Sequence, residues 1–199
     1  TITQNQPSEQ IKKLVNADPY ILSIGMLEPR KNHARLIESF EEVYKENPHI
    51  RLLLVGPDGP ARPQIDLALS KLSYNARSRI TITGSVSDND RSYILKNALM
   101  LAYPSIYEGF GLPILEAMST NTAIVASKEG SLEEIGGTAC EFVDAFSVSD
   151  IARGINLLLG DEKLRTKLIK NGDIELKKYS WDKTANELAN LYTKITEAK

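Results

Sequence analysis

Short apolar segments alternate with amphipathic segments along most of this chain, and few folds accommodate that alternation. Most of the apolar segments end in glycine or a polar residue, and in the segments between them apolar residues recur at spacings of three and four. The alternation predicts a single α/β domain built on a parallel sheet of about six strands, with helices on both faces. The predicted strands are residues 20–25, 51–56, 79–84, 99–103, 123–127 and 139–143.

The part of the chain after the last predicted strand is predicted to be helical. Ser147 with Asp150 is typical of a helix start, a second helix is predicted to end at Gly172, and a third is predicted to begin at Ser180. We therefore expect residues 1–199 to form one Rossmann-like domain with C-terminal helices, in which 147–199 is a helical tail. The third helix carries an apolar stripe that we expect to dock on another surface, and it consists of Trp181, Ala185, Leu188, Tyr192 and Ile195.

Composition excludes several classes of protein. With 42% hydrophobic and 25% charged residues, the 199-residue chain is ordinary for a globular domain, and a net charge of −2 is not typical of a nucleic-acid-binding protein. Cys140 is the single cysteine, so no internal disulfide can form, and its apolar neighbours predict a buried thiol. No apolar run approaches the length needed to span a bilayer, and the first residues lack a signal-peptide pattern.

Residues 103–118 join the end of a predicted strand to the start of a helix. Gly109 and Gly111 allow backbone N–H groups to approach a ligand closely, and Pro113 fits the first helical turn, where its missing N–H is no loss. A helix N-terminus that opens behind such a turn predicts an anion-binding site.

Charged residues are predicted to gather at the same edge of the sheet. Glu108 lies on the turn and Glu116 about one turn into the helix, where ionised carboxylates suit sugar or ribose hydroxyls; alternatively, both are solvent-facing charges near a helix N-terminus. Arg30 and Lys31 follow another strand and can neutralise a diphosphate; alternatively, they belong to a solvated loop. Because strand ends converge in parallel sheets, we expect both cations, Glu108 and the helix N-terminus to share one cleft.

The sequence favours neither a metal site nor a bound cofactor. Asp88 and Asp90 match a short acidic spacing that binds divalent ions elsewhere, but their position after Ser87 is explained by helix capping. The dinucleotide fingerprint lacks its third glycine because Ile114 stands there, and neither a phosphate-loop lysine motif nor a nucleophile with a paired histidine is found.

Three motifs stand out along the chain: Leu-Glu-Pro-Arg-Lys-Asn at 27–32, Gly-Ser-Val-Ser-Asp at 84–88, and residues 104–118 with their Glu-x7-Glu spacing. With these motifs, and with support from 130–135 and 179–181, the chain from about residue 20 to residue 192 resembles the C-terminal, donor-binding half of a family-4 retaining glycosyltransferase of the GT-B fold, mannosyltransferase-like. Two departures from that pattern are Met26, where many members have arginine, and Asn121, where glycine is usual.

The resemblance implies a role for each matching residue. Arg30 and Lys31 would face the donor diphosphate and Glu108 the transferred sugar, and these three are the predicted catalytic residues. Glu116 would hold the ribose hydroxyls, and the backbone near Val86 would meet the base. The full set of predicted donor-binding residues is Gly84, Val86, Gly109, Phe110, Gly111, Leu112 and Glu116.

The resemblance also implies a function and partners. The donor would be a nucleotide sugar, GDP-mannose or a related GDP-sugar, and the hexose would pass with retention and without a metal to a glycan or lipid-linked acceptor. The N-terminal acceptor domain of such an enzyme is absent from these 199 residues, which we therefore expect to be inactive alone. We expect a cytoplasmic location, with the inner face of the membrane as a contact of the full-length enzyme, and no nucleic-acid partner. The alternatives are a GT-B-like nucleotide-sugar epimerase or phosphorylase, and a non-catalytic flavodoxin-like interaction module.

Overall fold

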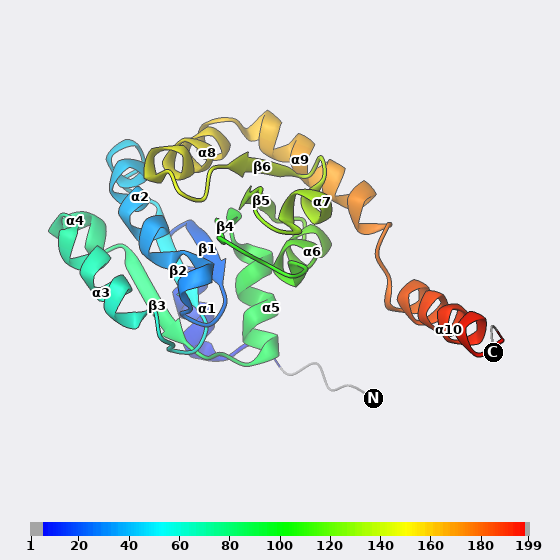
Figure 1. Cartoon of the computed structure of the whole chain (residues 1–199). Helices are drawn as coiled ribbons and strands as arrows, with labels where there is room; N and C mark the ends of the chain where they lie inside the picture. Colours follow the sequence, from blue (N-terminus) through cyan, green and yellow to red (C-terminus); the bar gives the residue numbers. More distant parts are fainter. Residues whose placement is uncertain (1–5, 198–199) are drawn as a thin grey trace.

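Six strands form one parallel sheet in the computed structural model, which describes residues 6–197 (Figure 1). The predicted strands are all present, with ends that agree with the sequence prediction to within one residue. The sheet order is β3-β2-β1-β4-β5-β6. The strands are β1 (Tyr20–Ile24), β2 (Arg51–Val55), β3 (Ile80–Gly84), β4 (Met100–Tyr103), β5 (Ala123–Ser127) and β6 (Cys140–Val143).

The direction in which strands are added reverses at β1. The chain first builds outward through β2 and β3 and then returns to place β4 on the other side of β1, so that Leu22 is paired with Leu53 on one side and Leu101 on the other. In parallel sheets of this kind, ligands bind at the carboxyl ends of the strands beside such a reversal. The fold therefore points to the loops after β1 and β4.

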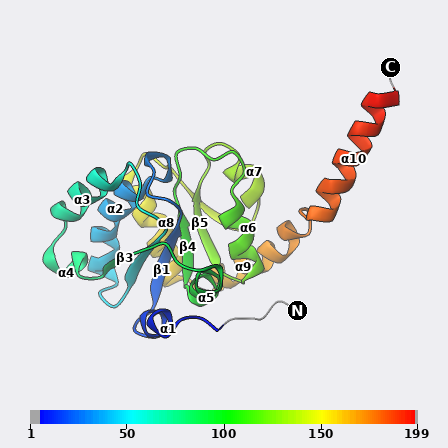
Figure 2. The ribbon, with the colours of Figure 1, turned by 90° about the horizontal axis from the view of Figure 1, so that it is seen from below.

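Helices cover both faces of the sheet, as the sequence predicts (Figures 1 and 2). All five residues of β1 are buried, because Ile21 packs into one layer and Leu22 into the other. Burial on both sides explains why the strands are continuous apolar runs. One layer contains α2 (His33–Glu46), α3 (Arg62–Lys71) and α8 (Val148–Gly160), with the short α4 (Tyr74–Arg77) beside α2, and the other contains α1 (Glu9–Val15), α5 (Asp88–Asn97), α6 (Leu112–Ser119) and α7 (Leu132–Gly136).

Serine side chains cap four of these helices, and the caps of α5 and α8 confirm the two predicted capping pairs. The Ser87 hydroxyl accepts a hydrogen bond from the backbone N–H of Asp90 at the start of α5, and Ser147 does the same for Asp150 at the start of α8, both at 3.1 Å. The Asp90 carboxylate accepts from the Ser8 backbone N–H at 2.7 Å and from the Ser87 hydroxyl at 2.9 Å. This carboxylate therefore joins the start of α5 to the segment before α1.

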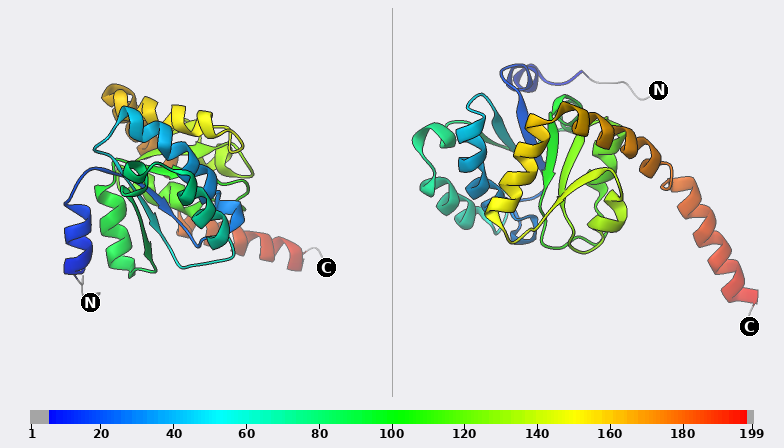
Figure 3. Two further views of the ribbon diagram at one scale, coloured as in Figure 1. Left: turned by 90° about the vertical axis from the view of Figure 1, so that its left-hand side faces the viewer. Right: turned by 90° about the horizontal axis from the view of Figure 1, so that it is seen from above.

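The C-terminal helices differ in how they pack. The prediction that a helix ends at Gly172 was wrong, because α9 (Glu162–Leu176) continues past it. Gly172 lies against Met118 of α6, where an added Cβ would be 3.3 Å from Cγ, so this glycine serves close packing and not termination. The last helix, α10 (Trp181–Glu197), extends away from the sheet (Figures 1 and 3). Its predicted stripe is exposed, at 80% for Trp181 and 61% for Tyr192, and within residues 6–197 nothing covers it.

Candidate active site

Charged side chains from the loops after β1 and β4 meet at the reversal point of the sheet. The Lys31 Nζ lies 2.7 Å from Glu108 Oε1, and Arg30 Nη1 lies 2.7 Å from Glu108 Oε2. The Tyr103 hydroxyl accepts from Lys31 Nζ and donates to Glu108 Oε1 at 2.8 Å. Arg30 Nε also pairs with Glu28 at 2.7 Å. The structure thus brings together the three predicted catalytic residues, although Lys31 and Glu108 are buried and not part of a solvated loop.

One buried asparagine fixes the loop that carries the two cations. Asn32 follows the 3-10 turn η1 (Pro29–Lys31) in the left-handed region, with φ of 61°, and its side-chain amide donates to the Pro104 carbonyl at 2.9 Å and the Ala145 carbonyl at 2.7 Å. The Ile106 backbone N–H donates to the carbonyl of Arg30 at 2.7 Å. The loops after β1, β4 and β6 are therefore joined to one another directly.

Hydrogen bonds to Glu108 determine its ionisation. Burial alone raises the pKa of Glu108, but hydrogen bonds from Lys31 and Tyr103 and the charge of Lys31 outweigh that effect, so the pKa lies below its usual range. Burial and the nearby charge of Glu108 raise the pKa of Tyr103, which keeps its hydroxyl protonated. The cluster therefore holds an ionised carboxylate between two cations near neutral pH.

The N-terminus of α6 opens beside this cluster. Gly111, the residue before the helix, has a φ of 105°, a conformation that favours glycine, whereas at Gly109 an added Cβ would meet nothing within 4 Å. Among residues 6–197, the backbone N–H groups of residues 109–112 find no acceptor. Free N–H groups at a helix N-terminus form an anion-binding site, as the sequence predicts for this turn.

A loop from the next part of the chain supports that turn. The Ser131 hydroxyl lies 3.1 Å from the carbonyl oxygen of Glu108 and 2.7 Å from that of Phe110. Gly130, with a φ of 62°, passes so close that an added Cβ would be 2.6 Å from the Glu108 carbonyl oxygen. The α7 loop thus fixes the backbone on which Glu108 is carried.

A pocket of about 290 Å³ lies at the carboxyl ends of β1, β2 and β3. Of the predicted site residues, Lys31 and Val86 line it directly, and Glu108 adjoins it through Lys31. Gly84 precedes the lining residues Ser85 and Val86, with a φ of 72°. The lining consists of Ile24, Gly25, Lys31, Val55, Gly56, Pro57, Ser85, Val86, Arg91 and Pro113.

Glu116 reaches the pocket through an arginine. Its Oε2 forms an ion pair with Arg91 Nη2, and Arg91 of α5 is itself part of the pocket lining. Glu116, Phe110 and Leu112 instead line a neighbouring groove of about 350 Å³ that continues to Trp181. The two predicted carboxylates therefore have separate cationic partners.

Sequence reasoning missed three residues of the site. Tyr103 is the last residue of β4, so its place at the carboxyl edge was a usable signal, although an aromatic residue there also suits the core. Arg91 lies in the first turn after the Ser87 cap, on the helix that follows β3, and Ser131 follows a glycine of the motif at 130–135. Arg91 and Ser131 are found only when strand order and loop contacts are known.

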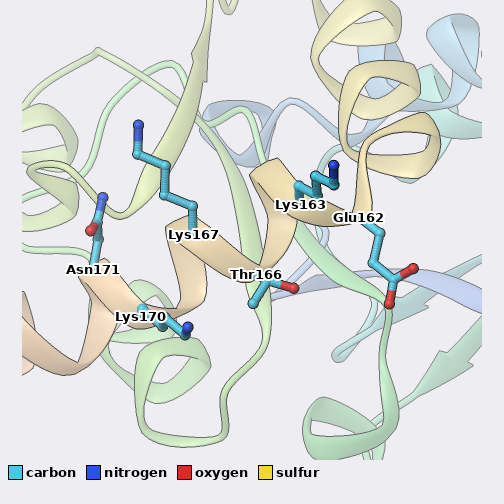
Figure 4. A pocket seen from close by; sticks show the side chains of 6 residues that line it. All are labelled: Glu162, Lys163, Thr166, Lys167, Lys170 and Asn171. Carbon is cyan, nitrogen blue, oxygen red and sulfur yellow. The ribbon is translucent and has the colours of Figure 1, made fainter.

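A larger hollow of about 530 Å³ lies elsewhere, on the outer surface of α9 (Figure 4). Lys167 and Lys170 project from the helix in different directions there, so their charges do not converge on one point. The hollow is lined by Glu162, Lys163, Thr166, Lys167, Lys170 and Asn171.

In residues 6–197, no group of three or more histidine, cysteine, aspartate or glutamate side chains is placed to hold a metal ion. Over the same residues, no helix is both long and apolar enough to cross a membrane.

Proteins with related sequences are sugar transferases. The chain is 31% identical over 185 residues to the serotype-specific mannosyltransferase WbdA of Escherichia coli, and the matched region covers 91% of this chain and 22% of that protein. It is 34% identical over 175 residues to the O-antigen chain mannosyltransferase B of Escherichia coli, where the matched region covers 87% of this chain and 45% of that protein. The chain thus spans less than half the length of either relative.

Solved structures of similar fold agree with the sequence comparison. Sucrose-phosphate synthase from Thermosynechococcus elongatus superposes with a TM-score of 0.78 and 26% identity, over 98% of this chain and 51% of that one. The C-terminal domain of a glycosyl transferase group 1 family protein from Francisella tularensis shares the fold, with a TM-score of 0.70 and 23% identity over 87% of this chain and 94% of that domain. The family model "Glycosyl transferases group 1" matches residues 5–174. The chain therefore belongs to the group 1 glycosyl transferases and has the GT-B C-terminal-domain fold that the sequence predicted.

Proposed function

We propose that this chain binds the nucleotide-sugar donor of a retaining hexosyltransferase, and that the donor is GDP-mannose or a related GDP-sugar. The observation that carries the proposal is the cluster of Lys31, Arg30 and Glu108 at the reversal point of the sheet, beside the free N–H groups of residues 109–112. The mannosyltransferase relatives support mannose as the sugar.

Lys31 and Arg30 both retain N–H groups that can bind a diphosphate. Lys31 Nζ has three N–H groups, of which two bond to Tyr103 and Glu108, and Lys31 lines the pocket. Arg30 is 45% exposed at its side chain, and its contacts to Glu28 and Glu108 use two of its five N–H groups. The carboxylates thus orient the cations without using all of their donors.

The helix N-terminus is needed for diphosphate binding, because the side-chain charges beside it cancel. Arg30, Lys31, Glu28 and Glu108 sum to zero at neutral pH, so these side chains alone offer a diphosphate no net positive charge. The partial positive charge at the start of α6 and its free N–H groups supply the remaining attraction.

The proposed reaction requires stabilisation of a leaving diphosphate. As the bond from sugar to phosphate breaks, negative charge develops on the phosphate, and donors already aimed at that position lower the barrier. Lys31, Arg30 and the N–H groups of residues 109–112 are such donors, and Glu108 is proposed to contact the transferred sugar. These groups carry the stabilisation in our proposal, which includes no metal.

The acceptor is proposed to be a glycan or a lipid-linked sugar at the cytoplasmic side of the membrane. A second domain would supply the other wall of the cleft, since this chain spans less than half of the relatives named above. Transfer activity is therefore assigned to the longer protein, and donor binding to these residues.

Titration calorimetry with GDP, UDP and ADP tests donor binding directly. We expect at least one of them to bind, with GDP the tightest, and Arg30→Gln to weaken binding because it removes a cation whose side chain is 45% exposed. Lys167→Gln on α9 is the matched control, since it removes one charge from the distant hollow. A folded sample that binds none of the three at millimolar concentration would refute the proposal.

A further inference from the structure

We propose that Arg91 is a positioning residue, which holds the Glu116 carboxylate in place for the ribose hydroxyls of the donor; this inference rests on the proposed function. Arg91 Nη2 pairs with Glu116 Oε2, and the arginine lines the pocket at the end of β3. The two residues come from different helices, α5 and α6, and so the pair joins the wall of the pocket to the helix behind the anion-binding turn.

The arginine is held at a fixed point of the fold. The Arg91 backbone N–H donates to the Ser87 carbonyl at 2.8 Å in the first turn of α5. The Ser87 side chain caps that turn, and Asp90 ties it to the Ser8 backbone N–H at 2.7 Å. Because several contacts fix the start of α5, the backbone that carries Arg91 has a defined position in the fold.

The ion pair leaves part of the carboxylate available. Only Oε2 of Glu116 contacts Arg91, and within residues 6–197 no hydrogen bond is formed to Oε1. An ionised carboxylate has about four acceptor positions, which is enough for the guanidinium and for ribose hydroxyls together.

The exposure of the pair argues against a role in stability. The side chains of Arg91 and Glu116 are 33% and 36% exposed, and ion pairs that remain in contact with water add little to folding stability. A glutamate exposed to this extent has several rotamers available when it has no partner. The ion pair favours one of them, and this choice of rotamer affects how well the carboxylate binds the ribose hydroxyls of a ligand.

The ratio of affinities for GDP and 2′,3′-dideoxy-GDP isolates this effect. Both ligands carry the same base and the same diphosphate, so a change in pocket charge alters both affinities and cancels in their ratio. A hydrogen bond to a charged group is lost when the hydroxyls are absent, so we expect the native chain to prefer GDP by roughly tenfold or more.

Substitutions at both ends of the ion pair complete the test. We expect Arg91→Gln and Arg91→Ala to lower the ratio to about threefold or less, Arg91→Lys to retain an intermediate ratio, and Glu116→Gln to abolish the preference. Adding Arg91→Gln to Glu116→Gln is expected to lower the ratio no further, because both residues act through one carboxylate. Melting temperatures close to that of the native chain show that each variant is folded.

Each alternative outcome is decisive. If Arg91→Gln and Arg91→Ala keep the full native ratio, Arg91 has no positioning role. If the native chain binds both ligands equally, Glu116 is not the ribose acceptor and the inference fails, whereas the proposed function stands. If the native chain binds none of GDP, UDP and ADP, the proposed function itself is wrong, and the inference that rests on it is wrong as well.

Discussion

Acid should destabilise this domain in part through one buried histidine. His33, the first residue of α2, is 2% exposed, and its Nδ1 has no hydrogen-bond partner among residues 6–197. Burial, followed by the charge of Lys31, lowers the pKa of His33 from 6.5 to about 4. The folded state therefore keeps the imidazole neutral at pH values at which the unfolded chain already binds a proton.

The sign and size of the effect follow from linkage. With the folded pKa below the unfolded one, the contribution of His33 is fully present above about pH 6.5 and declines as the pH falls toward 4. Between pH 7.5 and pH 5.0 the loss amounts to about 2 kcal/mol of the free energy of unfolding. Carboxylates add their own acid dependence, so the measurement must be a difference between variants.

Urea denaturation at pH 7.5 and pH 5.0 provides that difference. We expect the native chain to lose about 2 kcal/mol more than His33→Gln between these two pH values. Any pH-independent cost of the substitution cancels, because each variant is compared with itself. His49→Gln is the matched control, since His49 is exposed, and it should behave like the native chain. Equal pH-dependent losses in the native chain and His33→Gln would show that the histidine is not held neutral.

Two further predictions concern a turn and a thiol. Gly130→Ala should lower the free energy of unfolding more than Gly84→Ala does. Both residues have a left-handed φ, of 62° and 72°, which costs roughly 1–2 kcal/mol for alanine. Only the Cβ at Gly130 would also collide, at 2.6 Å from the Glu108 carbonyl oxygen. Equal losses in urea denaturation would contradict this reasoning. Cys140 is buried, and burial followed by the charge of Glu175 raises its thiol pKa, so a thiol-reactive disulfide reagent should label it slowly in the folded protein and rapidly in urea. Rapid labelling of the folded protein would show that the thiol is accessible.

The general architecture could be predicted because it depends on patterns local to the chain. Each strand is a short apolar run, and the helix starts at Ser87 and Ser147 carry their own capping residues. The meeting of Lys31 with Glu108 also follows from general rules, since the carboxyl ends of parallel strands share one edge.

The rest of the site depends on contacts between distant parts of the chain. Whether Arg91 faces Glu116 is decided by how α5 packs beside α6, and sequence spacing carries no record of that. Gly172 illustrates the same limit, because glycine serves both helix ends and close helix packing, and only the contact with Met118 distinguishes them. The direction of α10 could not be predicted either, because an apolar stripe does not specify which surface it faces.

The amide of Asn32 has a consequence for the energetics of ligand entry. It joins the loops after β1, β4 and β6, so the cations and the glutamate they contact sit on a single rigid support. Little conformational entropy then remains to be lost in this support when a ligand binds. Under the proposed function, donors that differ in base or sugar should accordingly associate at similar rates and differ mainly in residence time, since no loop ordering at this wall limits their arrival.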